Sequence, residues 1–194
     1  MKLAIYGYGH TVLKNKSHKV KPNHPHLKEL IQNMWETMEA AEGCGLAAPQ
    51  IGKSLQLFVA DSKIIYDSLS QENKTLYFKE GDHGVRDVFM NMEIMHHSSN
   101  QMWEETEGCL SLPSISGKVI RPWEITVRYQ NQKFETITQT FSGMTARVIL
   151  HEYDHTQGIL YTDRIKGLGK KLLEFKLKKI QNGNIVPPHQ MKFK

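Results

Sequence analysis

The sequence is poor in cysteine and has no long hydrophobic run. Its two cysteines, Cys44 and Cys109, stand far apart in 194 residues, so neither a disulfide framework nor a Cys-x-x-Cys motif is indicated. We therefore expect a reducing, cytoplasmic environment. The short apolar run at residues 3–6 is broken by Gly7 and Gly9, so we expect neither a signal peptide nor a membrane-spanning helix.

Acidic residues are fewer than basic ones, which leaves a formal net charge of +5. The basic excess is concentrated at 164–179, where Leu173, Leu177 and Ile180 also recur at helical spacing. This pattern predicts a basic C-terminal helix at about residues 165–182. Such a helix is either ordinary solvated surface or a contact with polyanions, which positive charge binds without sequence specificity.

Neither repeats nor a linker interrupt the chain, and we expect one domain comprising residues 1–194. Residues 25–41 repeat apolar side chains every three or four positions, which predicts a helix. Alternating apolar residues predict strands at 54–60 and 123–129, and a further strand is expected at 88–95. Residues 134–141 are expected to return as the hairpin partner of 123–129. A second helix is expected from about Ser142 to Gly158, so the fold class is α+β. No element is predicted for the polar stretch 61–87.

Residues 151–155, His-Glu-Tyr-Asp-His, form a His-Glu-x-x-His run inside this second helix. In a helix, His151 and His155 lie on one face, where two imidazoles can bind one metal ion. Glu152 stands beside them, where it can handle the proton of a metal-bound water. The run predicts metal-assisted hydrolysis, although the same short pattern also occurs in helices whose histidines only cap or form salt bridges.

The run needs a third ligand, and three positions are candidates. One extended form of the motif places a histidine six residues after the second, but Tyr161 stands there. Glu174 has the separation that another class uses, in a lysine-rich segment where an ion-paired surface glutamate is the simpler explanation. Cys109 would complete a Cys/His₂ set that leaves one position open for water, as in catalytic sites. A small, buried and inert cysteine is the alternative.

Glycines and small residues are concentrated at 43–50, Gly-Cys-Gly-Leu-Ala-Ala-Pro-Gln. Such a stretch lets the main chain pass close to another segment or to a ligand. Gln50 ends the stretch with a side-chain amide that can donate a hydrogen bond. Taken alone, an ordinary helix end followed by a strand explains the stretch as well.

Three segments together, 43–50, 107–111 and 151–155, resemble the motifs of peptide deformylase in their order along the chain. That family is recognised by Gly-x-Gly-Leu-Ala-Ala-Pro-Gln, then Glu-Gly-Cys-Leu-Ser, then His-Glu-x-x-Asp-His or its close variants. The resemblance covers about residues 5–165. It implies small antiparallel sheets packed around a central helix that carries the His-Glu-x-x-His motif, with further helices near the N-terminus and the C-terminus.

The resemblance implies removal of the N-formyl group from the initiator methionine of nascent chains, with release of formate. The metal ligands that it implies are Cys109, His151 and His155. Glu152 would act as general base and then as the acid that protonates the leaving amine. Gln50 and the backbone N–H of Leu110 would stabilise the oxyanion. The main chain of Gly45 would pair with the substrate.

A pocket for the methionine side chain is expected beside the ligands. Met144, Arg147 and Val148 lie seven, four and three residues before His151, so they share or border the ligand face of the helix. They would wall an apolar pocket, to which the resemblance adds Cys44. Packing of Met144 and Val148 in the core is the alternative.

The Cys/His₂ ligand set by itself suggests zinc. The resemblance instead implies Fe²⁺ as the native ion, with Ni²⁺ or Co²⁺ substituting and Zn²⁺ often bound on purification. It also implies N-formylmethionyl nascent peptides as partners, and contact with the ribosome through the basic C-terminal helix. Glu107 and Arg121 are candidates for a buried ion pair that supports the site.

Two other functions stay open. One is a metallopeptidase that uses Glu174 in place of Cys109. The other is a catalytically silent relative that only binds peptides or ribosomes. The presence of Gln50, Cys109 and Glu152 argues against the second, because loss of function would be expected to change at least one of them.

Overall fold

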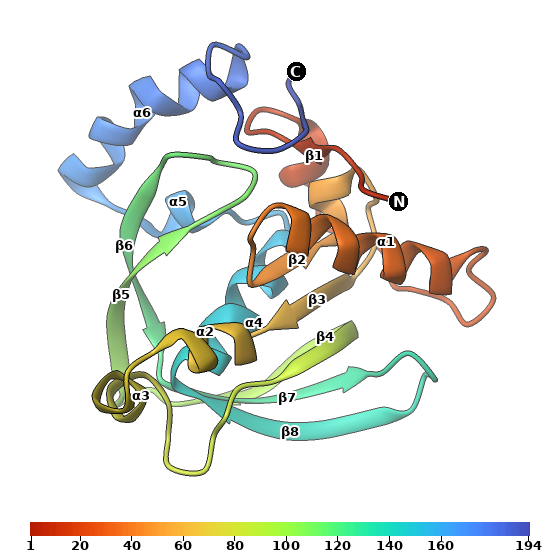
Figure 1. Cartoon of the computed structure of the whole chain (residues 1–194), viewed down its shortest axis with the longest axis vertical. Coiled ribbons are helices and arrows are strands. Elements are labelled where there is room, and N and C mark those ends of the chain that lie inside the picture. The colour runs from red at the N-terminus through yellow and green to blue at the C-terminus, as the bar shows by residue number, and fades with distance from the viewer.

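The computed structural model describes residues 1–194 apart from the side chains at positions 168 and 169 (Figure 1). Its largest sheet has five strands in the order β2-β3-β4-β7-β8. These strands are β2 (Gly45–Ala47), β3 (Leu57–Asp61), β4 (Arg86–His97), β7 (Glu124–Gln130) and β8 (Thr136–Ser142). Every neighbouring pair is antiparallel, and the predicted hairpin is confirmed as β7 and β8.

Helix α4 (Gly143–Thr156) lies in the middle of the molecule and contacts β2, β3 and β8 (Figure 1). Ala146, Ile149 and Leu150 form an apolar stripe at helical spacing and are buried with Phe58 and Phe89 of the sheet. The helix predicted from Ser142 to Gly158 is therefore confirmed, although the Ser142 side chain makes no capping hydrogen bond. The histidines lie on the opposite face of α4.

A second sheet consists of the antiparallel hairpin of β5 (Met102–Gly108) and β6 (Ser116–Pro122). Neither strand is predicted from the sequence. Glu107 and Arg121 point inward and are 5% and 2% exposed, so charged residues occupy positions where a strand pattern normally shows apolar ones. The hairpin lies along one side of α4 (Figure 1).

Helix α1 (Leu27–Ala40) confirms the helix predicted at 25–41, and it buries Ile31, Met34 and Met38. The polar stretch 61–87 contains two short helices that are not predicted from the sequence, α2 (Lys63–Ser68) and α3 (Gln71–Tyr77). The remaining short helices are η1 (Thr11–Leu13), η2 (Ala48–Ile51) and α5 (Tyr161–Arg164). No helix in the described part of the chain is long and apolar enough to cross a membrane.

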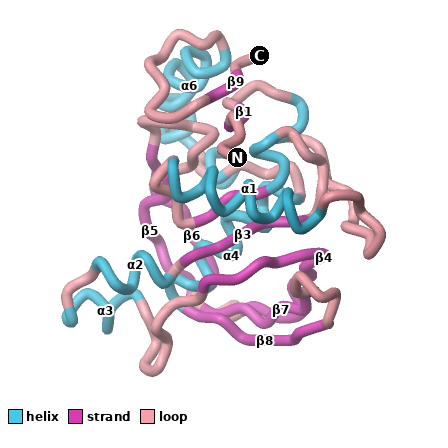
Figure 2. The backbone as a smooth tube through the Cα atoms, turned by 45° about the vertical axis from the view of Figure 1, so that its right-hand side comes forward, coloured by secondary structure: helices cyan, strands magenta, loops and turns pink.

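The C-terminal part begins with α6 (Gly167–Gln181), which confirms the helix predicted at about 165–182 and buries Leu177 and Ile180. The chain then turns back, and β9 (Met191–Lys192) pairs with β1 (Ile5–Tyr6) (Figures 1 and 2). This pair is parallel, unlike the antiparallel pairs of the other two sheets. Its two strands are joined by nearly the whole chain, and no local pattern signals such a connection.

Candidate active site

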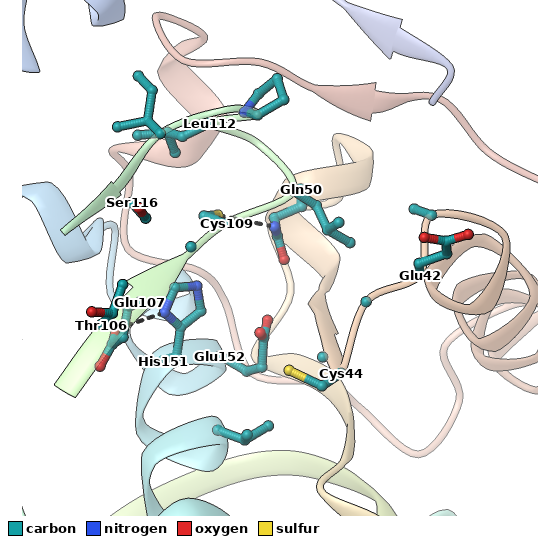
Figure 3. Close-up of a pocket in the computed structure, with 18 of the residues that line it drawn as sticks. Glu42, Cys44, Gln50, Thr106, Glu107, Cys109, Leu112, Ser116, His151 and Glu152 are labelled. Carbon is teal, nitrogen blue, oxygen red and sulfur yellow. Dashed lines mark hydrogen bonds and ion pairs between the residues drawn. The ribbon is translucent and has the colours of Figure 1, made fainter. Parts of the chain in front are cut away.

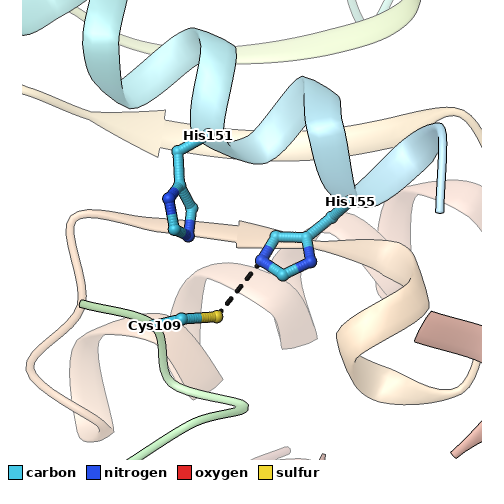
Figure 4. Close-up of side chains that lie close together, drawn as sticks. All are labelled: Cys109, His151 and His155. Atoms are coloured by element: carbon cyan, nitrogen blue, oxygen red, sulfur yellow. Dashed lines mark hydrogen bonds between the residues drawn. The ribbon is translucent and has the colours of Figure 1, made fainter. Parts of the chain in front are cut away.

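The two histidines of α4 and a cysteine from the end of β5 converge at one point (Figure 4). Helical spacing puts His151 and His155 on one face, with their ring centroids 5.1 Å apart. Cys109 directly follows β5, and its Sγ lies 3.2 Å from Nε2 of His155. One ligand atom from each of these residues lies within 4.8 Å of the others.

This cluster fits a divalent metal ion. Bond lengths to a tetrahedral zinc place a thiolate sulfur and an imidazole nitrogen roughly 3.5 Å apart, close to the distance seen here. Burial and the neighbouring His151 lower the pKa of His155, which keeps its imidazole neutral, as a metal ligand must be. Glu174 is exposed on α6 and does not belong to the cluster.

Glu107 orients His151 from behind. Its Oε2 lies 2.9 Å from Nδ1 of His151, which leaves Nε2 as the ring nitrogen for a metal (Figure 3). The same carboxylate accepts two hydrogen bonds from Arg121 and one from Arg147, at 2.6 to 2.8 Å. Burial opposes ionisation, but these donors hold the pKa of Glu107 far below its usual range. The predicted buried Glu107–Arg121 ion pair is thus confirmed.

The ion-pair network continues to the C-terminal part of α4. Arg121 also donates to Asp154 at 2.8 Å, and Arg164 of α5 donates to the same carboxylate. Asp154 is the fourth residue of the His-Glu-x-x-His run. Its carboxylate therefore ties the ligand helix to both β6 and α5.

Glu152 faces the cleft close to the ligands (Figure 3). It is 4% exposed, and one of its oxygens has no hydrogen-bond partner among the described residues. Burial raises the pKa of Glu152 to about 7. A carboxyl group that titrates near neutral pH is suited to accept and return a proton. Gly45 makes room for it, because a Cβ at that position would lie 2.4 Å from Oε1 of Glu152.

Two hydrogen-bond donors lie on the opposite wall. The Gln50 side chain is anchored through its oxygen to the Ala47 N–H at 2.7 Å, and its nitrogen lies 3.5 Å from the Cys109 sulfur (Figure 3). The backbone N–H of Leu110 directly follows the cysteine. Among the described residues it makes no hydrogen bond. The Leu110 N–H is therefore free to donate to a substrate oxygen. The Gln50 amide nitrogen donates over long distances, 3.5 Å to the Cys109 sulfur and 3.4 Å to Ser111 Oγ, and a substrate oxygen can replace these bonds.

The cleft containing these groups has a volume of about 720 Å³. One end is lined by the apolar parts of Cys44, Ile65, Met144 and Val148. Burial, with the charge of Glu152, raises the pKa of Cys44 to about 12, so its thiol stays neutral. This end of the cleft therefore presents apolar atoms and a neutral thiol.

Arg147 needs a correction. The sequence predicts that it walls an apolar pocket beside Met144 and Val148. It does line the cleft, but its guanidinium donates to Glu107 and to two carbonyl oxygens, and it stacks on the Trp103 ring. The buried carboxylate draws its charged end away from the pocket, so Arg147 supports Glu107 and contributes to the wall only in part.

Several lining residues are not predicted from the sequence, among them Ile65, Pro188 and His189. Ile65 comes from α2, in the polar stretch for which no element is predicted, and Pro188 and His189 come from the segment after α6. His189 lies 3.0 Å from the carbonyl oxygen of Leu110. No spacing relates this histidine to the motifs, because it reaches the cleft only through the pairing of β9 with β1.

Comparison with known proteins agrees with this geometry. Residues 2–171 match the family model for polypeptide deformylase. The peptide deformylases of Christiangramia forsetii and Flavobacterium johnsoniae are each 40% identical to the chain, over 100% of its length and 96% of theirs. The chain belongs to the peptide deformylase family.

Solved structures of deformylases have the same fold. The enzyme from Thermus thermophilus is 32% identical, with a TM-score of 0.77 over 94% of this chain and 99% of that one. The enzyme from Legionella pneumophila is 30% identical, with a TM-score of 0.77 over 95% and 98%. The protein is therefore a peptide deformylase, a metal-dependent hydrolase that removes the N-formyl group from nascent peptides.

Proposed function

We propose that this deformylase holds one divalent metal ion with Cys109, His151 and His155 and acts on formyl-methionine in the cytoplasm. The observation that carries the assignment is the convergence of these three residues with Glu152 beside a cleft. We assign Fe²⁺ as the native ion, with Ni²⁺, Co²⁺ or Zn²⁺ able to replace it. A thiolate ligand suits all of these ions, and it makes the iron form sensitive to oxidation.

A bound divalent ion supplies a nucleophilic water at neutral pH and polarises the formyl carbonyl. Glu152 takes the proton from the attacking water and then returns it to the leaving amine of methionine. Its raised pKa serves both steps, since the group is neither a strong acid nor a strong base near pH 7. The amide of Gln50 and the N–H of Leu110 donate to the oxygen on which negative charge develops.

The substrate main chain is proposed to lie along β2. The Cys44 carbonyl accepts a hydrogen bond from the N–H of Asp61 in β3, so the N–H and C=O of the next residue, Gly45, face away from β3 and into the cleft. A peptide can add to this free edge as an extra strand. Its methionine side chain then enters the apolar end, against Val148 and Met144.

The test is formate release from formyl-Met-Ala-Ser by protein loaded with Fe²⁺ or Ni²⁺ under oxygen-free conditions. Acetyl-Met-Ala-Ser is the matched substrate, because it differs by one methyl group at the reacting carbonyl. We expect formate from the first peptide and little hydrolysis of the second. If metal analysis shows one bound ion and no formate appears, the proposed function is wrong.

We also propose that α6 contacts the ribosome. Its buried side carries Leu177 and Ile180, while its lysines and two large apolar residues, Leu172 and Phe175, are exposed. This combination of positive charge and apolar surface suits a ribosomal protein–RNA surface.

Charge reversal of two exposed lysines of α6, Lys171→Glu with Lys178→Glu, should weaken co-sedimentation with ribosomes and reduce its salt dependence. The matched control reverses two exposed lysines elsewhere, Lys21→Glu with Lys133→Glu. Equal effects of both double variants would show only nonspecific attraction and would contradict the contact.

A further inference from the structure

The segment after α6 returns to the cleft and is anchored at both of its ends. At its start, the Asn184 N–H donates to Lys179 and Ile185 packs in a hydrophobic cluster with α6. At its far end, β9 pairs with β1, and the Ile5 N–H donates to Gln190. Between these anchors lies Val-Pro-Pro-His, residues 186–189, in which two prolines restrict the backbone.

His189 attaches this segment to the loop that follows β5. The carbonyl of Leu110 accepts its hydrogen bond, and the carbonyls on either side are also occupied, that of Cys109 by Leu112 and that of Ser111 by Tyr8. Three successive carbonyls of the loop are thus held. The segment is part of the same rigid wall that carries Cys109 and the Leu110 N–H.

The direction of the substrate brings its later residues to this wall. Under the proposed function the reacting group lies beside Gly45, which faces Glu152, and the methionine side chain fills the apolar end. Residues 41–45 line the cleft and Leu46 and Ala47 do not, so the open space for the main chain that follows extends from Gly45 toward Gly43. A Cβ on Gly43 would lie 2.8 Å from the Leu110 side chain, so the cleft is narrow there. Pro188 and His189 line the same cleft as Glu42, Gly43 and Leu110.

We propose that Pro188 and His189 form the subsite for the second and third residues of the substrate peptide. This inference rests on the proposed function and adds a binding surface to it. The imidazole and pyrrolidine rings supply a rigid, largely apolar wall. Such a wall holds an extended peptide through its backbone and small side chains, with little discrimination among sequences. Formyl-methionine without following residues does not reach it.

The experiment compares formyl-Met-Ala-Ser with formyl-methionine amide, which ends before the proposed subsite. In the metal-loaded enzyme, His189→Ala should raise KM for the tripeptide by about five- to tenfold, as expected for one lost packing and hydrogen-bonding group, with kcat nearly unchanged. Both parameters for the amide should stay within about twofold of their wild-type values, since the amide has no group at that subsite. Val186→Ala, at a neighbouring position that is 94% exposed, is the matched control and should change neither substrate.

A second measurement is independent of turnover. The His189 ring resonances, assigned by their loss in the variant, should shift on addition of the product Met-Ala-Ser and not on addition of methionine amide. If His189→Ala lowers kcat/KM equally for both substrates, His189 only supports the loop that carries Cys109. If the kinetics of the tripeptide do not change, His189 neither binds the peptide nor supports that loop. Either result would refute the proposed subsite. Absence of formate from both substrates with the wild-type enzyme would instead refute the proposed function.

Discussion

Replacing Glu107 by glutamine should destabilise the enzyme far more than its small change in shape suggests. Every partner of this carboxylate is a donor: Arg121 and Arg147 on Oε1, Arg121 and His151 on Oε2. An amide NH₂ at either oxygen loses two of these bonds and faces N–H groups instead. The change also removes the carboxylate paired with the buried Arg147 guanidinium and one of the two carboxylates paired with Arg121.

Loss of one partner from a buried ion-pair network costs about 3–5 kcal/mol. For a chain of this size, each kcal/mol corresponds to about 2–4 °C in Tm, so Glu107→Gln should lower Tm by about 6–20 °C. Glu93 offers a matched control, because it also lies between two cations, Lys19 and Arg128, but is 43% exposed. Glu93→Gln should change Tm little, because an exposed ion pair contributes little to stability.

Thermal unfolding should be followed for both variants in metal-free protein, because metal bound to the native state would add its own stabilisation. Metal affinity is measured separately and should fall about 10- to 100-fold in Glu107→Gln alone, since His151 loses its orienting partner. If the two variants unfold within about 2 °C of each other by this same scale, the network does not carry the stability argued for it.

Three further changes test the proposed roles. Glu152→Gln should lower kcat by about 10²- to 10⁴-fold with metal content unchanged, and a loss below about tenfold would exclude it as the proton carrier. Cys109→Ser should abolish metal retention, as measured by metal analysis after gel filtration, whereas Glu174→Gln should not; the reverse pattern would favour a metallopeptidase site. Gly45→Ala places a methyl group 2.4 Å from Glu152 and should lower kcat about 10²-fold by displacing the carboxylate. Gly108→Ala, whose new methyl meets nothing nearer than 3.9 Å, is its control, and equal loss in both would show that any added bulk in the cleft is harmful.

The motif residues and most elements were predictable because each rests on local spacing. Helical periodicity located α1, alternation located β3 and β7, and β8 was expected as the hairpin partner of β7. The resemblance to the peptide deformylase motifs then favoured Cys109 over Tyr161 and Glu174 as the third ligand. The proposed roles of these residues, and the predicted extent of the catalytic core at about 5–165, stay predictions.

The missed features share a physical cause, which is that long-range contacts decide them. The hairpin of β5 and β6 is hidden because Glu107 and Arg121, buried against each other, break the apolar alternation. The direction of the Arg147 guanidinium follows from that same carboxylate. His189 reaches the cleft through a parallel pairing between the two ends of the chain, for which the sequence holds no local signal.

The pairing of β1 with β9 has a consequence for the order in which the molecule opens. Only two residues on each side form it, and a short contact near the chain ends is weakly protected against local opening. Hydrogen exchange should therefore show β9 detaching while the five-stranded sheet stays closed. On warming, the enzyme would then lose affinity first for peptides that reach the Pro188–His189 subsite. It would continue to deformylate shorter substrates until the five-stranded sheet unfolds.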